Sequence, residues 1–591
     1  MQKNVSESGA TSGAMRRRFH FDGSGIIIVG AATLLVVLIV LPMLWLGIFA
    51  FSEIGGGAGW TVSNFTKLFT DDTFFDPLKM TLIIAFSVGT ICALVAAPMA
   101  WLVSRSDMPF ATTIRTLTMA SLVTPPFLGA IAWELLAAPN SGLLNQLWRS
   151  LTGAPADEAL LDIYTLTGVV FVISCYTFPY VFILIANALS RMPGELEDAS
   201  SMLGAGRWAT ARRVTIPLAL PAVLAGLLVA FLQALNLFGS PAILAIPAGF
   251  HTLTTKIWSL FQYPPKPELA AAAALPLLLL TIVLLRTQSA IIGRRSYAVL
   301  GGKYGAPRLV GLGWLRWPAL GLCLFILMMP VFLPYAALLN AALSKIASRL
   351  VSADNITLAN FTFTFFELSA TRPAIENTLI LGGLSATLGT LLALVLSYVT
   401  ARKAVSGHRA LAFLATAPLA IPGIVLGVGL FLAYTRPWFT IAGVDVPPLV
   451  LYGTLWILLI AYITIELPAA FQQLQSAFHA VHVELEEASR ILGATRLRAL
   501  RDVTAPLLRS GVIATWCFIF VAVIRELSAA VILFTSDTKV VSVLIFDLKE
   551  SGDLGAIAVL GLAMILITTV VLLLANSLSG RPGDVRLRGN G

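Results

Sequence analysis

The sequence predicts an all-α, polytopic membrane protein with about twelve transmembrane helices in two parallel repeats of six. Three observations lead to this fold class: the composition, the length of the apolar segments, and motifs that recur at a nearly constant spacing. Hydrophobic residues make up 58% of the 591 positions and charged residues only 12%, against about 25% in a typical soluble domain. This composition excludes a string of soluble domains, which would need more charges, and a disordered chain, which would have fewer apolar residues.

The apolar segments have the length that a helix needs to cross a bilayer, about 20 residues. The first follows the basic cluster Arg16, Arg17 and Arg18 and exceeds the ~7–15 residues of a signal-peptide core, so we expect a retained span. Twelve spans are expected, at residues 25–52, 79–104, 113–137, 164–190, 218–244, 269–292, 317–344, 375–401, 409–434, 448–472, 508–534 and 554–578.

The distribution of positive charge predicts the orientation of these spans. An even number of spans places both termini on one side, where 27 of the 39 Lys and Arg residues then fall, with 11 on the other side and Arg525 within a span. Because basic residues accumulate on the cytoplasmic side of membrane proteins, we expect both termini in the cytoplasm. This bias explains the net charge of +9 without a nucleic-acid partner.

The two halves of the chain repeat one another. The matched residues lie 296 or 297 positions apart before the loop between the third and fourth spans and 289 apart after it: Asn64-Phe65-Thr66 with Asn360-Phe361-Thr362, Arg105 with Arg402, Pro179 with Pro468, Gly204 with Gly493, and Pro217 with Pro506. Six spans per repeat give both halves the same orientation. The expected organisation is a cytoplasmic tail (1–24), a first repeat (25–292), a cytoplasmic linker (293–316), a second repeat (317–578) and a cytoplasmic tail (579–591).

Two charged loops occupy the same position in each repeat and carry the clearest functional signal. The first begins ELEDASSMLGAG at Glu195 and the second ELEEASRILGAT at Glu484. Apolar residues at helical spacing predict a short helix in each loop, with acidic residues at its start, where the helix dipole favours them. A glycine then lets the chain turn, and a proline opens the next span. The simplest alternative is an amphipathic helix at the membrane surface with ordinary solvated charges.

These loops resemble the EAA loop of ABC importer permeases, in which Glu-Ala-Ala is followed by three residues, a Gly and a later Leu-Pro. The resemblance implies that each loop is a coupling helix that docks into a cleft of an ATP-binding subunit, within a type I importer fold. The implied coupling residues are Asp198, Ala199, Gly204 and Pro217, with Glu487, Ala488, Gly493 and Pro506 in the second repeat. The first copy has Asp in place of Glu, both copies have Ser third, and Ala505 replaces the usual branched residue, so the two contacts are expected to be unequal.

The resemblance also predicts the partners of the chain. Because the sequence contains no G-x-x-x-x-G-K-[ST] phosphate loop, ATP is expected to be used by a separate subunit, and no cofactor or enzymatic activity is expected of this chain. The implied partners are two copies of an ATP-binding subunit, a periplasmic solute-binding protein and the lipid bilayer of the bacterial inner membrane. The rival hypothesis is a self-powered secondary transporter, which would need ion relays in both halves and would not explain the paired loops.

Among the ionisable residues within the predicted spans, four stand out: Glu134, Glu466, Arg525 and Glu526. Charges are costly at the bilayer centre, so each is expected to face the bundle interior or a cavity, except that Glu134 could reach water at the external end of its span. The repeat partner of Arg525 is Asn236. We therefore consider Asn236, Glu466, Arg525 and Glu526 as candidates for the pathway or its gate, the alternative being a structural ion pair that involves Glu466.

The substrate is predicted by resemblance alone. The segments that begin at Leu237, Thr252 and Glu526 are similar to fused permeases for ferric iron, while permeases for thiamine, the polyamine putrescine and phosphonate remain alternatives. No cluster of Tyr, His or carboxylates indicates a metal site. The four cysteines, Cys92, Cys175, Cys323 and Cys517, lie in apolar segments without the spacing of metal ligands.

Overall fold

The computed structural model describes residues 24–54, 57–294, 309–403, 405, 407–435, 439–441, 444–446 and 451–578. The predicted terminal tails, apart from Ser24, and most of the predicted linker lie outside the described residues.

The first repeat contains fourteen helices and one hairpin among its described residues. Its helices are α1 (Ser24–Leu35), α2 (Leu41–Ala50), α3 (Ser63–Thr70), α4 (Asp72–Arg105), α5 (Ala111–Ala120), α6 (Pro126–Ala137), α7 (Leu143–Thr152), α8 (Leu166–Ser190), α9 (Glu195–Met202), α10 (Arg207–Thr210), α11 (Ile216–Asn236), α12 (Gly239–Leu244), α13 (Leu253–Ser259) and α14 (Pro267–Arg294). Short segments of π-helix are η1 (Val36–Val40) and η3 (Ala211–Thr215), and η2 (Ser121–Val123) is a 3-10 helix. The hairpin pairs β1 (Ser52–Glu53) with β2 (Gly57–Trp60).

The second repeat follows the same order with small differences. Its helices are α15 (Arg316–Leu327), α16 (Leu333–Ala342), α17 (Ala359–Thr362), α18 (Thr371–Ala401), α19 (His408–Thr416), α20 (Gly423–Thr435), α21 (Leu455–Ala480), α22 (Val483–Ile491), α23 (Arg496–Ala499), α24 (Ala505–Ile524), α25 (Ala530–Leu533), α26 (Val541–Ser551) and α27 (Leu554–Leu578). The short turns are η4 (Gly313–Leu315), η5 (Met328–Phe332), η6 (Phe363–Glu367), η7 (Ala417–Ala420) and η8 (Leu500–Thr504), and β3 (Phe439–Ile441) pairs with β4 (Val444–Val446).

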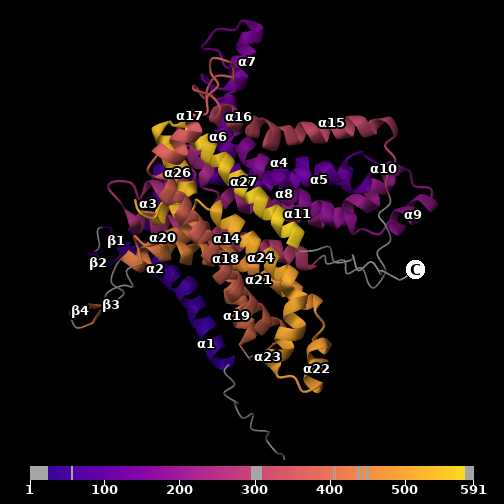
Figure 1. Ribbon diagram of the computed structural model, residues 1–591, viewed down its shortest axis with the longest axis vertical. Helices are drawn as coiled ribbons and strands as arrows, with labels where there is room; N and C mark the ends of the chain where they lie inside the picture. Colours follow the sequence, from indigo (N-terminus) through magenta and orange to yellow (C-terminus); the bar gives the residue numbers. More distant parts are fainter. Residues whose placement is uncertain are drawn as a thin grey trace, which may run out of the picture.

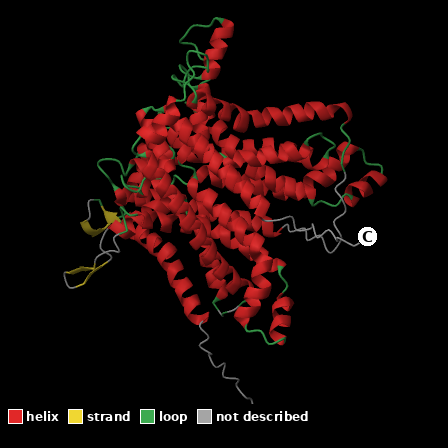
Figure 2. Cartoon of the chain, in the orientation of Figure 1, coloured by secondary structure: helices red, strands yellow, loops and turns green. Residues whose placement is uncertain are grey.

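The predicted all-α membrane fold is confirmed (Figure 2). Within the described residues, ten helices are long and apolar enough to cross a bilayer, and two bent helix pairs raise the number to twelve if each pair counts as one span. The bent pairs are residues 111–137, with an angle of 98°, and residues 408–435, with an angle of 108°.

The third and ninth predicted spans are therefore both bent. Pro125 and Pro126 interrupt the third span, and Pro422 interrupts the ninth. A proline lacks the backbone N–H of a helical hydrogen bond and pushes the preceding residue toward extended backbone, as at Thr124, where ψ is 123°. The helix consequently ends and restarts in a new direction at each of these prolines.

The fifth and eleventh spans also end earlier than predicted. Helix α11 ends at Asn236 and α24 at Ile524, and each is followed by a break and a short helix, α12 or α25. Arg525 and Glu526 thus lie in a break between two helices instead of within a continuous span. Apolar composition continues across the break, which is why the length of the apolar segment did not indicate it.

The recurring Asn-Phe-Thr motif has a structural role at the end of the first span of each repeat. The side-chain amide of Asn64 donates to the carbonyls of Ala50 and Ser52, at 3.1 and 2.8 Å. Asn360 donates in the same way to the carbonyls of Ala342 and Ser344, at 3.1 and 2.9 Å. These bonds satisfy carbonyls that the end of a helix leaves without partners.

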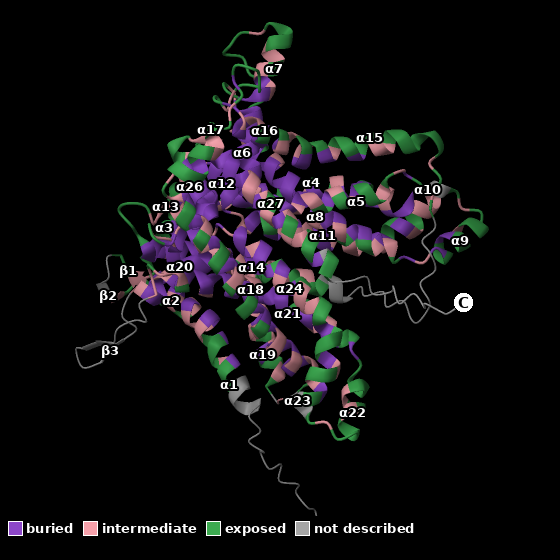
Figure 3. Cartoon of the chain, viewed as in Figure 1, coloured by how far each residue is buried: buried purple, intermediate pink, exposed green. Residues whose placement is uncertain are grey.

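The helices diverge into two arms that share a common packed region (Figure 1). Helices α4, α5, α8 and α11 run toward the end that carries α9, whereas α18, α19, α21 and α24 run toward the end that carries α22. The first span of each repeat packs against the other repeat, because α2 contacts α20 and α16 contacts α6. Buried residues concentrate where the arms meet, and both tips are exposed (Figure 3).

Candidate functional site: a central cavity and two loop helices

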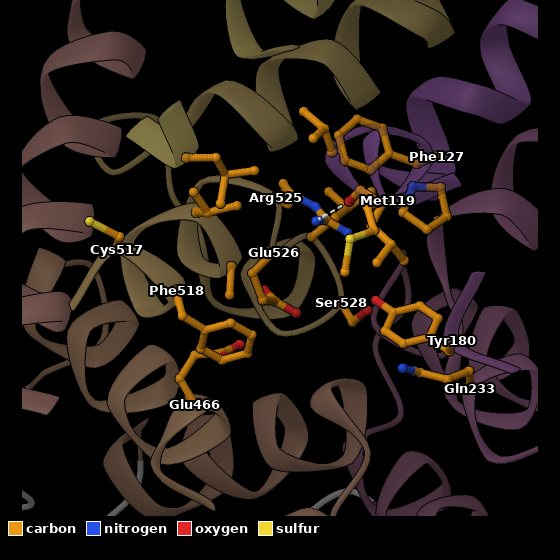
Figure 4. A pocket seen from close by; sticks show the side chains of 18 of the residues that line it. Met119, Phe127, Tyr180, Gln233, Glu466, Cys517, Phe518, Arg525, Glu526 and Ser528 are labelled. Carbon is orange, nitrogen blue, oxygen red and sulfur yellow. Dashed lines mark hydrogen bonds between the residues drawn. The ribbon is translucent and has the colours of Figure 1, made fainter. Parts of the chain in front are cut away.

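A cavity of about 900 Å³ lies between the two repeats. Its first-repeat wall comes from the bend between α5 and α6 and from α8 and α11, and its second-repeat wall comes from α21, α24 and α27. The lining is mainly apolar, but polar side chains from both repeats also line it (Figure 4): Tyr180, Gln233, Glu466, Arg525, Glu526 and Ser528. Gln473 lines the cavity as well. Three of the four residues predicted for the pathway or gate, Glu466, Arg525 and Glu526, therefore lie at one cavity.

Arg525 joins the two repeats at this cavity. Its Nη1 donates a hydrogen bond to the backbone carbonyl of Leu122, which lies in the bend of the first repeat. Within the described residues, Arg525 forms no ion pair with Glu466, the partner that the structural alternative proposed. The break after α24 thus places a positive charge against the point where the third span changes direction.

The Glu526 carboxylate is held by the backbone of the same break. Its oxygens accept hydrogen bonds from the N–H of Ala529, at 3.0 Å, and of Ala530, at 3.3 Å. These N–H groups belong to the start of α25, where a negative charge is favoured. Glu466 approaches the cavity from the middle of α21, one residue before the buried Leu467 and two before Pro468, so two carboxylates lie on the second-repeat wall.

Asn236, the repeat partner of Arg525, does not line the cavity. It is the last residue of α11, and its Oδ1 accepts a hydrogen bond from the Thr281 hydroxyl of α14 at 3.4 Å. The neighbouring Leu237 lines the cavity instead. Asn236 is thus placed as a contact between helices.

The expectation that Glu134 reaches water was wrong. Glu134 is buried, and its Oε1 accepts from Lys549 of the second repeat and from the hydroxyl of Tyr164, both at 2.7 Å. Burial, together with the negative charge of Glu134, raises the pKa of Tyr164, so this hydroxyl keeps its proton and donates. The sequence offered no signal for this pair, because Glu134 and Lys549 are 415 residues apart.

The two charged loops form short helices, α9 and α22, which we call the loop helices. Gly204 and Gly493 end them with φ of +81° and +91°, the left-handed region that favours glycine. The N–H groups of Gly204 and Ala205 donate to the carbonyls of Ser201 and Ser200, and those of Gly493 and Ala494 donate to Arg490 and Ser489. This pattern is a Schellman cap. Pro217 and Pro506 follow as the second residues of α11 and α24.

One face of each loop helix is exposed at the tip of an arm. Asp198, Ala199, Glu487 and Ala488 all lie on exposed positions. Large apolar residues near them are almost fully exposed, and their exposed fractions match between the repeats: Met202 87%, Leu203 87%, Ile491 85% and Leu492 89%. Two small helices therefore present apolar side chains and an acidic residue outward at repeat-related positions.

The other face of each loop helix carries an ion pair that the sequence-based reasoning missed. Glu197 pairs with Arg105 at the end of α4 and accepts from the Thr215 hydroxyl at 2.7 Å. In the second repeat, Glu486 pairs with Arg402 at 2.8 Å and accepts from Thr504 at 2.8 Å. The available signal was the match of Arg105 with Arg402, together with a glutamate before Asp198 and Glu487 in both repeats.

Two repeats of six spans or bent pairs around a shared central cavity define a polytopic membrane transport protein. The chain belongs to the family described as "Binding-protein-dependent transport system inner membrane component", which matches residues 30–297 and 385–582. One match falls in each repeat, so the protein is a fused, multi-pass permease of an ABC importer of this family.

The chain is also similar to individual proteins. The chain is 25% identical over 538 residues to the ferric transport system permease protein FbpB of Actinobacillus pleuropneumoniae, covering 87% of this chain and 74% of that protein. It is 30% identical over 222 residues to the molybdenum transport system permease protein ModB of Mycobacterium tuberculosis, covering 38% and 80% respectively. A solved bacterial ABC transporter that imports alginate aligns with a TM-score of 0.38 and 16% identity, covering 46% of this chain and 95% of that chain.

Proposed function

We propose that this permease carries ferric iron from a periplasmic binding protein into the cytoplasm, driven by ATP-binding subunits that dock on α9 and α22. The observation that carries the proposal is the pair of loop helices with matched, exposed outward faces in a chain of this family. With both termini in the cytoplasm, these helices face the compartment that holds ATP.

The docking function is supported by the chemistry of the exposed faces. Leu203 and Leu492 are large apolar side chains at the exposed tips of the two arms. Apolar side chains in such positions are typical of a surface that a partner protein covers. Asp198 and Glu487 lie beside them and are suited to charge-assisted contacts with basic groups of a partner. One face per repeat provides two docking points, so one chain is expected to bind two ATP-binding subunits.

The central cavity is suited to the translocation pathway, because polar side chains from both repeats line it. Glu466 and Glu526 place two carboxylates against the single guanidinium of Arg525. The choice of ferric iron as substrate is supported by the similarity to a ferric permease over 87% of the chain.

The binding protein provides the test of the substrate. The permease, its ATP-binding subunit and candidate binding proteins would be placed in liposomes, and the ATPase rate would be measured with each binding protein loaded with Fe(III), thiamine or a polyamine. We expect stimulation and uptake with the Fe(III)-loaded protein. Stimulation only by a thiamine- or polyamine-loaded protein would contradict the iron assignment. Uptake that continues without the ATP-binding subunit would instead indicate a secondary transporter.

A further inference from the structure

The Arg–Glu pairs beneath the loop helices form the same junction in both repeats. Besides its glutamate, each arginine donates to the backbone carbonyl of the residue that leads into the loop helix: Arg105 to Met192, and Arg402 to Val481, both at 3.2 Å. The glutamate in turn accepts from the threonine that precedes α11 or α24. Four segments thus meet at one buried ion pair in each repeat: the end of α4 or α18, the residues that follow α8 or α21, the loop helix, and the start of α11 or α24.

Each junction connects the inner face of a loop helix to a long helix. Helix α4 has 34 residues and α18 has 31, which correspond to lengths of about 51 and 46 Å at 1.5 Å per residue. The loop helices otherwise pack mainly against the short segments α10 and η3, or α23 and η8. The ion pair is therefore a directional side-chain link between each loop helix and the core of its repeat.

The opposite parts of α4 and α18 hold segments that contact the other repeat. The Thr81 hydroxyl accepts from the N–H of Leu253, the first residue of α13, at 2.7 Å. The Thr378 hydroxyl accepts from the N–H of Val541, the first residue of α26, at 2.9 Å. Helix α26 carries Lys549, which pairs with Glu134 of the first repeat.

We propose that Arg105 and Arg402 are positioning residues that fasten each loop helix to a long helix that acts as a lever, α4 or α18, and so transmit its movement to the cavity and the far side of the protein. This inference rests on the proposed docking of ATP-binding subunits at α9 and α22. The two faces of each loop helix then have separate functions. Asp198 and Glu487 hold the partner, whereas Glu197 and Glu486 hold the lever.

The test separates transmission from docking. Glu197→Gln and Glu486→Gln keep the side-chain shape and an oxygen that accepts from the threonine, but they remove the charge that holds the arginine. Because a buried arginine without its partner could impair folding, the double variant Arg402→Met, Glu486→Leu removes both charges together. Asp502→Asn is the matched control, since Asp502 forms an exposed pair with Arg498 in the same cytoplasmic segment.

Cys517 provides a native reporter because it lines the central cavity. The complex with its ATP-binding subunits would be treated with N-ethylmaleimide in the nucleotide-free and the vanadate-trapped states, and alkylation of Cys517 would be measured by peptide mass spectrometry. We expect the wild-type rate to differ severalfold between the states. In the Gln variants and the double variant, the difference between the Cys517 alkylation rates of the two states should be at least fivefold smaller than in the wild type. The ATP-binding subunit should still co-purify with these variants.

Each outcome has a distinct meaning. A wild-type difference in the Glu486→Gln chain and in the double variant would overturn the lever, as would a wild-type Cys517 rate that is the same in both states. The same loss in Asp502→Asn would also contradict it, because that change leaves the junction intact. Failure of the ATP-binding subunit to co-purify with the wild-type chain would contradict the proposed docking function instead.

Discussion

Lys549 of the second repeat and Glu134 of the first repeat form an ion pair across the protein, with 2.7 Å between Nζ and Oε1. The repeat-related position has a different chemistry, because Phe431 occupies the place of Glu134 at the 297-residue offset and contacts Phe261 edge-to-face, with 5.1 Å between ring centroids. The two repeats therefore contact each other at both related positions, through an ion pair at Glu134 and through aromatic packing at Phe431.

We expect Lys549→Met to destabilise the protein by about 2 kcal/mol, because it leaves the carboxylate of Glu134 buried without its cation. The value is below that of a fully buried pair, since the Lys549 side chain is 22% exposed. The apparent unfolding temperature in detergent measures the effect. Arg372→Ala, which removes one partner of an exposed pair with Glu376, should leave the unfolding temperature nearly unchanged. Equal shifts for the two variants would contradict a structural role for the Glu134–Lys549 pair.

Glu487→Ala is expected to weaken binding of the ATP-binding subunit about tenfold, since a charge-assisted contact is lost from the exposed face of α22. Asp198→Ala should have a smaller effect because its shorter side chain makes a less demanding contact. Affinity of the purified permease for the subunit and uptake in cells, at matched membrane levels, measure both. Glu376→Ala removes the same charge on the opposite side and serves as the control. Normal coupling in the double variant Glu487→Ala, Asp198→Ala would rule out docking at the loop helices.

Gly493→Pro should abolish transport while the chain still inserts into the membrane. Proline cannot adopt the φ of +91° found here, and it lacks the N–H that Gly493 donates to the carbonyl of Arg490. Gly493→Ala should be milder, at about 1 kcal/mol of local strain, because no atom lies within 4 Å of the added Cβ. Uptake and membrane abundance would be measured together, and normal uptake by the proline variant would show that the Schellman cap is dispensable.

One chain is expected to assemble with two ATP-binding subunits, because both loop helices belong to the same polypeptide. Native mass measurement of the detergent-solubilised complex tests this directly, with a permease contribution of 63.0 kDa. A complex with two permease chains per two ATP-binding subunits would contradict the prediction.

Much of the fold could be predicted from local features of the sequence. The helix composition, the repeat and the two loop helices followed from apolar length, constant offsets and the Gly-Pro pattern around Gly204 and Gly493. The bends at Pro125 and Pro422 had a signal in the prolines, but Pro179 and Pro468 lie inside continuous helices, so proline alone does not identify a break.

The site was only partly predictable for the same reason. Glu466, Arg525 and Glu526 were selected because charge is rare inside a span, and they lie at one cavity. Asn236 was selected by repeat position, which does not report the direction of a side chain. Glu197 and Glu486 were overlooked because a charged residue in a loop has no apolar surroundings to make it conspicuous.

The sequence by itself determined roughly where the membrane segments and the loop helices lie and how often they repeat, because apolar length, charge bias and turn chemistry act locally along the chain. Only the tertiary structure decided that Arg105 lies under α9, that Arg525 reaches the carbonyl of Leu122, and that Lys549 meets Glu134. In a membrane helix nearly every face is apolar, so the pattern of hydrophobic residues does not specify which face packs inward. Those pairings depend on how distant helices pack against one another in three dimensions.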